Sequence, residues 1–387
     1  MRILHTSDWH IGRTFHGHST LGALDGVFDA LVEAVRTHHV DVVVAAGDIY
    51  DSSTPSAEAV DLLNSILLRI RDAGAQVLLT SGNHDSPTRL GTMSAFATSA
   101  GVHVITKPGQ IGTPVTLDDE HGPVHFYGIP FLEPARLRHV WPLESSRTQR
   151  DVLTYAMELV RGDLAERGGR SIVLAHTFVQ GVEGESCDSE RDIVGTTVGG
   201  VDKVPVPTFD GVDYAALGHI HGRARLSPHV RYSGAPLHYS FSEGDKPRGG
   251  WIVDLDAAGL NQVEWLDLPV PRPLTVLTGT LDELVADGAH ADVADHWISA
   301  IITDSTRPMD AMRTLQAVFP HCAHLEFRPD RLHDTETSTY SELVRGKTDD
   351  ELVDSFLVKV RNGEGTTADE AELVRDVIAE REAAVSS

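Results

Sequence analysis

The chain has 387 residues, 41% of them hydrophobic and 23% charged, which is the composition of a globular protein long enough for two or more domains. Its net charge of −25 argues against a simple nucleic-acid-binding protein, because a basic groove is the usual footprint on DNA. No apolar run approaches the roughly 18 residues of a membrane span, and two cysteines are too few for a disulfide framework, so we expect a cytoplasmic protein without membrane contact.

Residues 1–268 predict one α/β domain in which short apolar runs end in polar residues. Continuous apolar strands of this kind are buried on both faces of a sheet. Between them, the apolar positions around Leu31 and around Ile66 repeat with helical spacing and predict two amphipathic helices. The strand-like runs are Val42–Val44, Val77–Leu79, Ile172–Leu174 and Tyr214–Leu217.

A stiff proline-rich segment, Pro269–Pro273, predicts a domain boundary. Residues 274–328 then predict a small α+β domain. Its expected strands cover residues 274–278, 297–303 and 324–327, and its expected helix covers residues 311–318.

The last part of the chain predicts a polar linker over residues 329–347 and a helical pair over residues 348–387. Each helix begins with the pattern of a capping box, at Thr348–Glu351 and at Thr367–Glu370. Apolar residues at helical spacing follow both boxes, so both helices are expected to be amphipathic.

Five polar clusters follow the strand-like runs of the first domain in a fixed order. In open α/β sheets, ligands bind at the carboxyl ends of the strands, so we expect the five loops to bring carboxylates, imidazoles and one amide together. Such donors suit Mn²⁺, Fe²⁺ or Zn²⁺ and lack the thiolates of a structural zinc site. The clusters are Asp8-x-His10, Gly47-Asp48-x-x-Asp51, Gly82-Asn83-His84-Asp85, His176 and Gly218-His219-x-His221.

Residues two positions apart share a face of an extended segment, so Asp8 and His10 are expected to hold one metal together, and His219 and His221 likewise. Each short motif alone is weak evidence, because a lone aspartate of this kind is usually a turn residue and a lone histidine such as His176 is usually packed in the core. The ordered set of five clusters is what predicts a metal site.

In this order the five motifs resemble the calcineurin-like metallophosphoesterase family. The resemblance implies a four-layer α/β/β/α sandwich that holds two divalent metal ions, with Mn²⁺ as the expected metal. It also implies which residues hold them: Asp8, His10, Asp48 and His221 for the first metal, and Asp48, Asn83, His176 and His219 for the second. His84 would be the catalytic residue facing the substrate phosphate, with Asp85 orienting its ring.

In that family the chemistry needs no protein nucleophile. Two metal ions activate a water molecule and hold the phosphate oxygens, and His84 would stabilise the developing charge or protonate the leaving group. The resemblance therefore implies a metal-dependent phosphodiesterase.

Further segments are similar to the bacterial SbcD family of nuclease subunits. They are Thr6–Gly12, Ser189–Arg191, Val198–Gly200, Phe209–His221, Tyr232–Pro236 and Phe241–Glu243. This resemblance implies a double-strand exonuclease and single-strand or hairpin endonuclease of recombination and repair, driven by the ATPase partner SbcC. Residues 274–328 would be a cap that steers DNA, and the C-terminal helical pair would dock on the coiled-coil root of SbcC in a heterotetramer containing a homodimer of this chain.

One position departs from related archaeal and eukaryotic nucleases, since Asp51 occupies the place of their second active-site histidine. A carboxylate there does not bind phosphate, so no catalytic role is transferred to Asp51. Two alternatives stay open: the same chemistry on a small phosphodiester or phosphoprotein, which the acidic charge favours, and a binding scaffold with a dead site. Bound metals or a basic partner would have to supply the positive charge that DNA requires.

Overall fold

The computed structural model describes residues 1–137, 139–142, 148–179, 203–329, 346–361, 363 and 365–385. The chain divides into two compact units, Met1–Pro271 and Arg272–Ser387, and the division falls inside the predicted proline-rich segment. The motifs Ser189–Arg191 and Val198–Gly200 and most of the predicted linker, residues 330–345, lie outside the described residues.

The first sheet of unit Met1–Pro271 has the strand order β14-β13-β1-β4-β5-β6. Its strands β1, β4, β5 and β6 run parallel, whereas β13 is antiparallel to β1, and β14 to β13. The bounds are β1 Arg2–Thr6, β4 Val42–Ala46, β5 Gln76–Thr80, β6 Val102–Ile105, β13 Gly249–Asp256 and β14 Gly259–Asp267.

The second sheet has the order β11-β12-β10-β9-β8-β7. Here β8, β9, β10 and β12 run parallel, and the edge strands β7 and β11 are antiparallel to their neighbours. The bounds are β7 Val115–Asp119, β8 Gly122–Ile129, β9 Arg170–His176, β10 Tyr214–Gly218, β11 Ala224–Arg225 and β12 Val230–Tyr232. The predicted runs lie in β4, β5, β9 and β10. Every residue of β4, β9 and β10 is buried, and so are residues Val77–Thr80 of β5.

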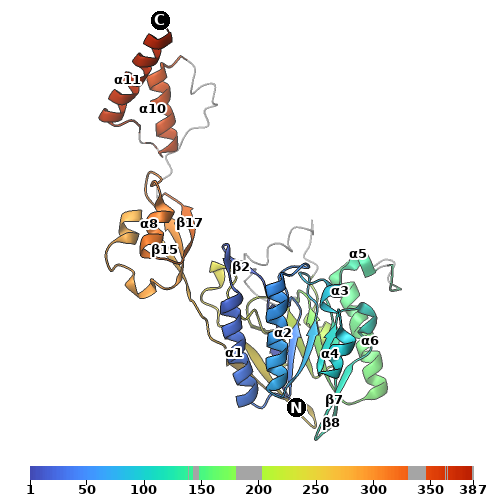
Figure 1. Ribbon diagram of the computed structural model, residues 1–387. Helices are drawn as coiled ribbons and strands as arrows, with labels where there is room; N and C mark the ends of the chain where they lie inside the picture. Colours follow the sequence, from blue (N-terminus) through green and yellow to red (C-terminus); the bar gives the residue numbers. More distant parts are fainter. Residues whose placement is uncertain are drawn as a thin grey trace. The chain divides into compact units, whose positions relative to one another are not determined.

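The two sheets pack face to face over a shared apolar layer that includes Ile3, Val44, Phe126, Leu174 and Tyr214. Helices α1 (Leu21–Thr37) and α2 (Ala57–Asp72) cover the outer face of the first sheet, and α6 (Gln149–Arg167) covers the outer face of the second. Figure 1 shows α1 and α2 on one side of this unit and α6 on the other. The predicted α/β/β/α sandwich is therefore confirmed.

Side-chain caps set where two of these helices begin. Ser56 accepts a hydrogen bond from the backbone N–H of Ala59 at the start of α2, and Thr148 forms a capping box with Asp151 at the start of α6. Shorter elements connect the layers: the hairpin β2 Thr14–Phe15 and β3 His18–Ser19, helices α3 Pro87–Leu90, α4 Ser94–Ser99 and α5 Pro134–Leu137, and the 3₁₀ turns η1 Pro108–Gln110, η3 Val206–Phe209 and η4 Phe241–Glu243.

The second unit contains a parallel sheet of order β15-β16-β17 with α7 and α8 packed against it. The bounds are β15 Leu274–Gly279, α7 Leu281–Val285, η5 Ala291–Val293, β16 Trp297–Ile302, α8 Ala311–Val318 and β17 Cys322–Phe327. The predicted strands and the helix over residues 311–318 are present. The sequence did not predict α7, because five residues are too few to show a helical period.

Two helices, α10 (Asp349–Val360) and α11 (Ala368–Val385), follow in the same unit. Both expected capping boxes form, since Glu351 accepts from the backbone N–H of Thr348 and Glu370 from that of Thr367. Large apolar side chains of the pair stay exposed, namely Phe356, Leu373 and Val377. No helix among the described residues combines the length and the apolar character needed to cross a bilayer.

Candidate metal centre

The five polar clusters lie where β1, β4 and β5 of the first sheet and β9 and β10 of the second end. Glycine allows the loops of the two sheets to approach closely there. A Cβ on Gly47 would lie 2.3 Å from Nδ1 of His176, and a Cβ on Gly218 would lie 1.9 Å from the carbonyl oxygen of Ala46. The glycines of the Gly47-Asp48 and Gly218-His219 pairs therefore allow the two sheets to lie close together.

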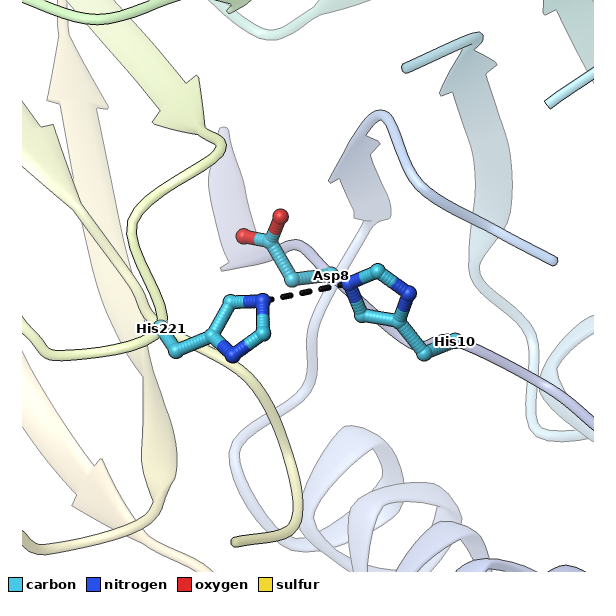
Figure 2. A group of neighbouring side chains, drawn as sticks. All are labelled: Asp8, His10 and His221. Carbon is cyan, nitrogen blue, oxygen red and sulfur yellow. Dashed lines mark hydrogen bonds between the residues drawn. The ribbon is translucent and has the colours of Figure 1, made fainter. Parts of the chain in front are cut away.

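One set of donors gathers around His10. Its Nε2 lies 3.2 Å from Nε2 of His221 and 3.6 Å from Oδ2 of Asp48. Asp8, His10 and His221 offer ligand atoms that all lie within 4.8 Å of one another. Figure 2 shows the two imidazole rings facing each other with Asp8 beside them.

A second set gathers around His176. Its Nε2 lies 3.0 Å from Oδ1 of Asn83, 3.2 Å from Nδ1 of His219 and 3.4 Å from Oδ2 of Asp48. Nδ1 of His219 is also 3.2 Å from Oδ1 of Asn83. Asp48 thus contacts both sets, and all seven predicted ligands come together in two adjoining groups.

The chemistry of these contacts fits a bound cation. Nδ1 of His176 lies 2.8 Å from the carbonyl oxygen of Ala46 and must donate its proton there, so Nε2 of the neutral ring is a lone-pair donor. That nitrogen faces the oxygens of Asn83 and Asp48, which are also electron-pair donors. A positive charge has to lie among them: a proton on Nε2 supplies it in the metal-free chain, and a divalent metal ion supplies it with the same atoms as ligands once Nε2 is deprotonated.

The pKa shifts of the buried side chains at the site also indicate that positive charge is needed there. Burial would lower the pKa of His176, but Asp48 raises it to about 9. Burial would raise the pKa of Asp48, yet the imidazoles of His176 and His10 hold it well below its usual range. Burial also raises the pKa of Asp8 to about 6. A centre made of buried anions and nitrogen lone pairs is stabilised by cations.

The backbone at the site is strained. Positive φ angles occur at Asp8 (53°), His10 (44°), Asp48 (50°) and His219 (107°), which are half of the eight non-glycine residues with this conformation in the described part of the chain. Such conformations cost about 1–3 kcal/mol each and cluster at functional sites. The expectation that Asp8 and His10, or His219 and His221, share the face of an extended segment is wrong, because turns rather than strands aim these side chains.

His84 lies at the rim of the centre. Its side chain is 26% exposed, whereas that of His10 is 1% exposed. Nδ1 of His84 lies 2.9 Å from the carbonyl oxygen of Asp51, so it donates to that oxygen and leaves Nε2 for other partners. Its backbone N–H donates to Oδ1 of Asp48 over 2.9 Å, which ties the loop to the bridging carboxylate.

Asp85 makes different contacts from those the resemblance implied. Its buried carboxylate accepts hydrogen bonds from the backbone N–H groups of Ile49, Tyr50 and Gly82 at 2.9–3.1 Å. It therefore fixes the loops after β4 and β5 to each other. The contact that orients the ring of His84 comes from the main chain of Asp51 instead.

The carboxylate of Asp51 faces the other donor set. Its Oδ1 lies 3.2 Å from Nδ1 of His10, at ion-pair distance but outside hydrogen-bond geometry, and 3.5 Å from Nη1 of Arg13. The guanidinium of Arg13 in turn stacks over the ring of Tyr239, 5.0 Å from its centroid. Asp51 therefore contacts both His10 and His84, a role that sequence reasoning did not assign.

Sequence reasoning also missed a buried ion pair behind His221. Glu243 and Arg248 are 0% and 2% exposed, and Oε2 of Glu243 lies 2.8 Å from Nη2 of Arg248. Oε1 of Glu243 lies 3.5 Å from Nδ1 of His221, and Arg248 donates to the carbonyl oxygen of His221. The segment Phe241–Glu243 resembles SbcD in sequence, but the sequence does not show that Glu243 pairs with His221. The buried contact in the structure shows it.

Comparison with protein families agrees with this geometry. The calcineurin-like phosphoesterase model matches residues 1–223, which include all five clusters. The chain belongs to the calcineurin-like phosphoesterase family. Membership implies a metal-dependent phosphoesterase, and the His and Asp groups are consistent with a divalent metal site. The SbcD C-terminal model, described as the type 5 capsule protein repressor C-terminal domain, matches residues 270–361, so the chain is SbcD-like.

Two solved structures are distantly similar to this chain. The Plasmodium protein GAP50, described as the anchor in the inner membrane complex, is 11% identical, covers 85% of this chain and 98% of its own, and has a TM-score of 0.38. A β-glucosidase from Exiguobacterium marinum is 11% identical, covers 84% of this chain and 89% of its own, and has a TM-score of 0.22. Similarities at this level carry no functional information.

Proposed function

We propose that this chain is the nuclease subunit of an SbcCD-type complex, a two-metal phosphodiesterase that hydrolyses DNA. It would act as an exonuclease on double-stranded ends and as an endonuclease on single strands and hairpins in recombination and repair. The observation that carries the proposal is the convergence of seven nitrogen and oxygen donors, from five loops of two sheets, on one edge of the fold.

The proposed ligands are those implied by the family. Asp8, His10, Asp48 and His221 would hold one metal ion, and Asp48, Asn83, His176 and His219 would hold the other. When bound, the metals, for which Mn²⁺ is our first choice, lower the pKa of water and stabilise negative charge on phosphate oxygens. The chain itself contributes the fixed positions of its ligands and one group at the rim.

His84 is the proposed catalytic residue. Because its Nδ1 donates to the Asp51 carbonyl oxygen, its Nε2 is the ring nitrogen left for the substrate, and it holds a proton there when the ring is an imidazolium. Partial exposure at the rim leaves this nitrogen accessible to a phosphate. From there it hydrogen-bonds a phosphate oxygen and delivers its proton to the leaving oxygen, a contribution of about 10²–10⁴-fold for a positioned general acid.

The second unit supports DNA and an SbcC-type ATPase as partners. Residues 270–361 match the SbcD C-terminal model, which separates this chain from phosphoesterases that lack such a domain. In α10 and α11 the side chains of Phe356, Leu373 and Val377 are 62%, 64% and 57% exposed. We propose that this apolar surface packs on the coiled-coil root of the ATPase, and that the chain forms a homodimer within a heterotetramer.

The proposal is tested with linear and hairpin DNA in the presence of Mn²⁺, using the protein alone and with an SbcC partner and ATP. We expect cleavage that requires the metal and falls at least 100-fold in His84→Ala, within the general-acid range of about 10²–10⁴. The matched control is His121→Ala, an exposed histidine in the turn between β7 and β8, which should cleave as the unchanged protein does.

One observation favours a substrate other than DNA. The net charge of −25 suits a small phosphodiester or a phosphoprotein better than DNA. If no preparation cuts DNA while bis(p-nitrophenyl) phosphate is hydrolysed with Mn²⁺, the metal site stands and the DNA substrate does not. If neither is hydrolysed and Mn²⁺ binds, the chain is a scaffold.

A further inference from the structure

Two exposed arginines follow directly after the proposed ligand His221. Arg223 lies two residues after His221, and Arg225 lies four residues after it, in the edge strand β11. Neither makes an ion pair with a carboxylate among the described residues. In a chain with 57 acidic and 32 basic residues, unpaired arginines side by side on one short segment are unexpected.

The neighbouring strand adds a third positive charge. Arg225 lies opposite Arg231 in the antiparallel pair of β11 and β12. Arg231 is only 7% exposed; it donates from Nη2 to the carbonyl oxygen of Pro228, and its buried Nε has no acceptor among the described residues. Like charges directly opposite each other destabilise a strand pair, so this arrangement is unfavourable unless an anion compensates it.

Two tryptophans from the first sheet contact two of these arginines, Arg223 and Arg231. The guanidinium of Arg223 stacks 4.8 Å from the ring centroid of Trp265, and that of Arg231 stacks 4.6 Å from the ring of Trp251. The two indole rings meet edge to face at 4.9 Å. We call Arg223, Arg225, Arg231, Trp251 and Trp265 the arginine–tryptophan cluster.

The contact with Trp265 uses no hydrogen-bond acceptor. A cation–π contact involves the face of the indole ring, so the N–H groups of Arg223 stay available for the two-pronged hydrogen bonds that suit phosphate. Because the indole restrains the side chain, less conformational entropy is lost when it binds an anion. The Lys246 side chain lies beside Gly222, which adds a further basic group to this side of the centre.

We propose that Arg223 and Arg225 of the arginine–tryptophan cluster bind backbone phosphates of the DNA strand next to the phosphate being cleaved. The distance suits this, since two residues along the chain separate Arg223 from His221 by at most about 7 Å. The inference rests on the proposed nuclease function and adds the surface that binds the polymer. It also explains how an acidic chain holds DNA: Arg223 and Arg225 make no ion pair among the described residues and follow closely after His221.

The test is DNA affinity as a function of salt. A labelled duplex is titrated with Mn²⁺ present, in a His84→Ala background that slows cleavage, into the full chain and into the same chain carrying Arg223→Glu/Arg225→Glu. We expect at least 10-fold weaker binding at ~0.1 M salt, and a slope of log K against log salt that is smaller by about 1.8, because two lost phosphate contacts each release about 0.9 counterion. The variant Arg223→Lys/Arg225→Lys should keep most of that slope, since it keeps the charge.

A matched control separates a local contact from net charge. Arg36→Glu/Arg167→Glu makes the same charge change at exposed arginines in the last turns of α1 and α6, which precede strands and so lie at the sheet edge opposite the centre. We expect its DNA affinity to stay within about two-fold of the unchanged protein, because exposed charges beyond a Debye length of about 8–10 Å are screened. An equal loss in both double variants would overturn the proposal.

A second measurement compares DNA binding with hydrolysis of a small substrate in the same variant. Hydrolysis of bis(p-nitrophenyl) phosphate with Mn²⁺ is inhibited by a competing duplex, and the concentration for half inhibition should rise at least 10-fold in Arg223→Glu/Arg225→Glu. If the unchanged protein binds and cuts DNA and this variant does so equally well, the arginine–tryptophan cluster is not the DNA surface. If the unchanged protein hydrolyses the small diester but binds no DNA, the proposed nuclease function itself fails.

Discussion

The carboxylate of Asp8, after β1 of the first sheet, accepts the backbone N–H of His219, after β10 of the second sheet, at 2.9 Å to Oδ1 and 3.1 Å to Oδ2. Ser7 donates its hydroxyl to the same carboxylate. One side chain therefore joins the ligand-bearing loops of both sheets while it also faces the metal centre.

This double role predicts the behaviour of Asp8→Asn. The amide oxygen can still accept the N–H of His219, so the fold should persist, but the negative charge that favours a cation is lost. We expect the rise in Tm that Mn²⁺ produces in the unchanged protein to shrink sharply, because a ligand stabilises the folded state in proportion to RT ln(1 + [L]/Kd). Scanning calorimetry with and without Mn²⁺ measures this. An unchanged metal-induced rise would exclude Asp8 as a ligand.

Asp51 is predicted to position His10. In Asp51→Ala the ring of His10 loses the oxygen that lies 3.2 Å from its Nδ1, and we expect Mn²⁺ affinity to fall about 10–100-fold, as for other groups that orient metal-binding histidines. Asp51→Asn keeps an oxygen at this place and should recover most of the affinity. Titration calorimetry with Mn²⁺ distinguishes the variants, and equal affinities in Asp51→Ala and the unchanged protein would contradict the role.

These contacts show where sequence reasoning stops. The strand-end motifs are local, so an α/β domain with metal-binding residues at its strand ends could be predicted from runs such as Val42–Val44 followed by Gly47-Asp48. The four-layer sandwich and the assignment of each ligand came from the resemblance to the family. The positive φ of Asp8 and His10 could not be predicted, because it depends on hydrogen bonds from their backbone N–H groups to Gly47 and Asp48 of the neighbouring loop.

Residues that contact the proposed ligands but do not bind metal could not be predicted from the sequence for a related reason. Glu243 is separated from His221 by 22 residues, and a glutamate in a polar segment normally lies at the surface. Arg231 of β12 meets Trp251 of β13 only because the two sheets pack face to face. Such pairings depend on tertiary packing and carry no signal in spacing or periodicity.

The Glu243–Arg248 pair is predicted to stabilise the fold and also to hold His221 in position. Replacing one partner of a buried pair leaves an uncompensated charge and costs about 3–5 kcal/mol. We expect Glu243→Gln to lower the free energy of unfolding by roughly that amount, and Glu243→Gln/Arg248→Met to recover part of it, since neither residue is then charged. Urea denaturation of both variants measures the difference. A double variant less stable than Glu243→Gln would show that Arg248 stabilises His221 independently of the glutamate.

The last prediction concerns acid stability and rests on His5, which joins the two sheets away from the metal centre. Its Nε2 lies 3.1 Å from the carbonyl oxygen of Leu217 and must donate to it, so its Nδ1 accepts the hydroxyl of Tyr214 at 2.9 Å and the ring is neutral. Burial lowers the pKa of His5 to about 3. In the unfolded chain the pKa is near its ordinary value of about 6.5, so between pH 6.5 and 3 the unfolded state binds the extra proton and stability falls as the pH falls.

His5→Gln removes this titration while its amide can still donate to one partner and accept from the other. We expect the variant to be less stable at pH 7, by about 1–2 kcal/mol for imperfect hydrogen bonds, but to lose stability less steeply from pH 6.5 to 4. Urea midpoints measured in EDTA across this range test the slope without interference from metal binding. Parallel pH profiles for the two proteins would mean that His5 is protonated at little cost and that other buried histidines set the acid limit.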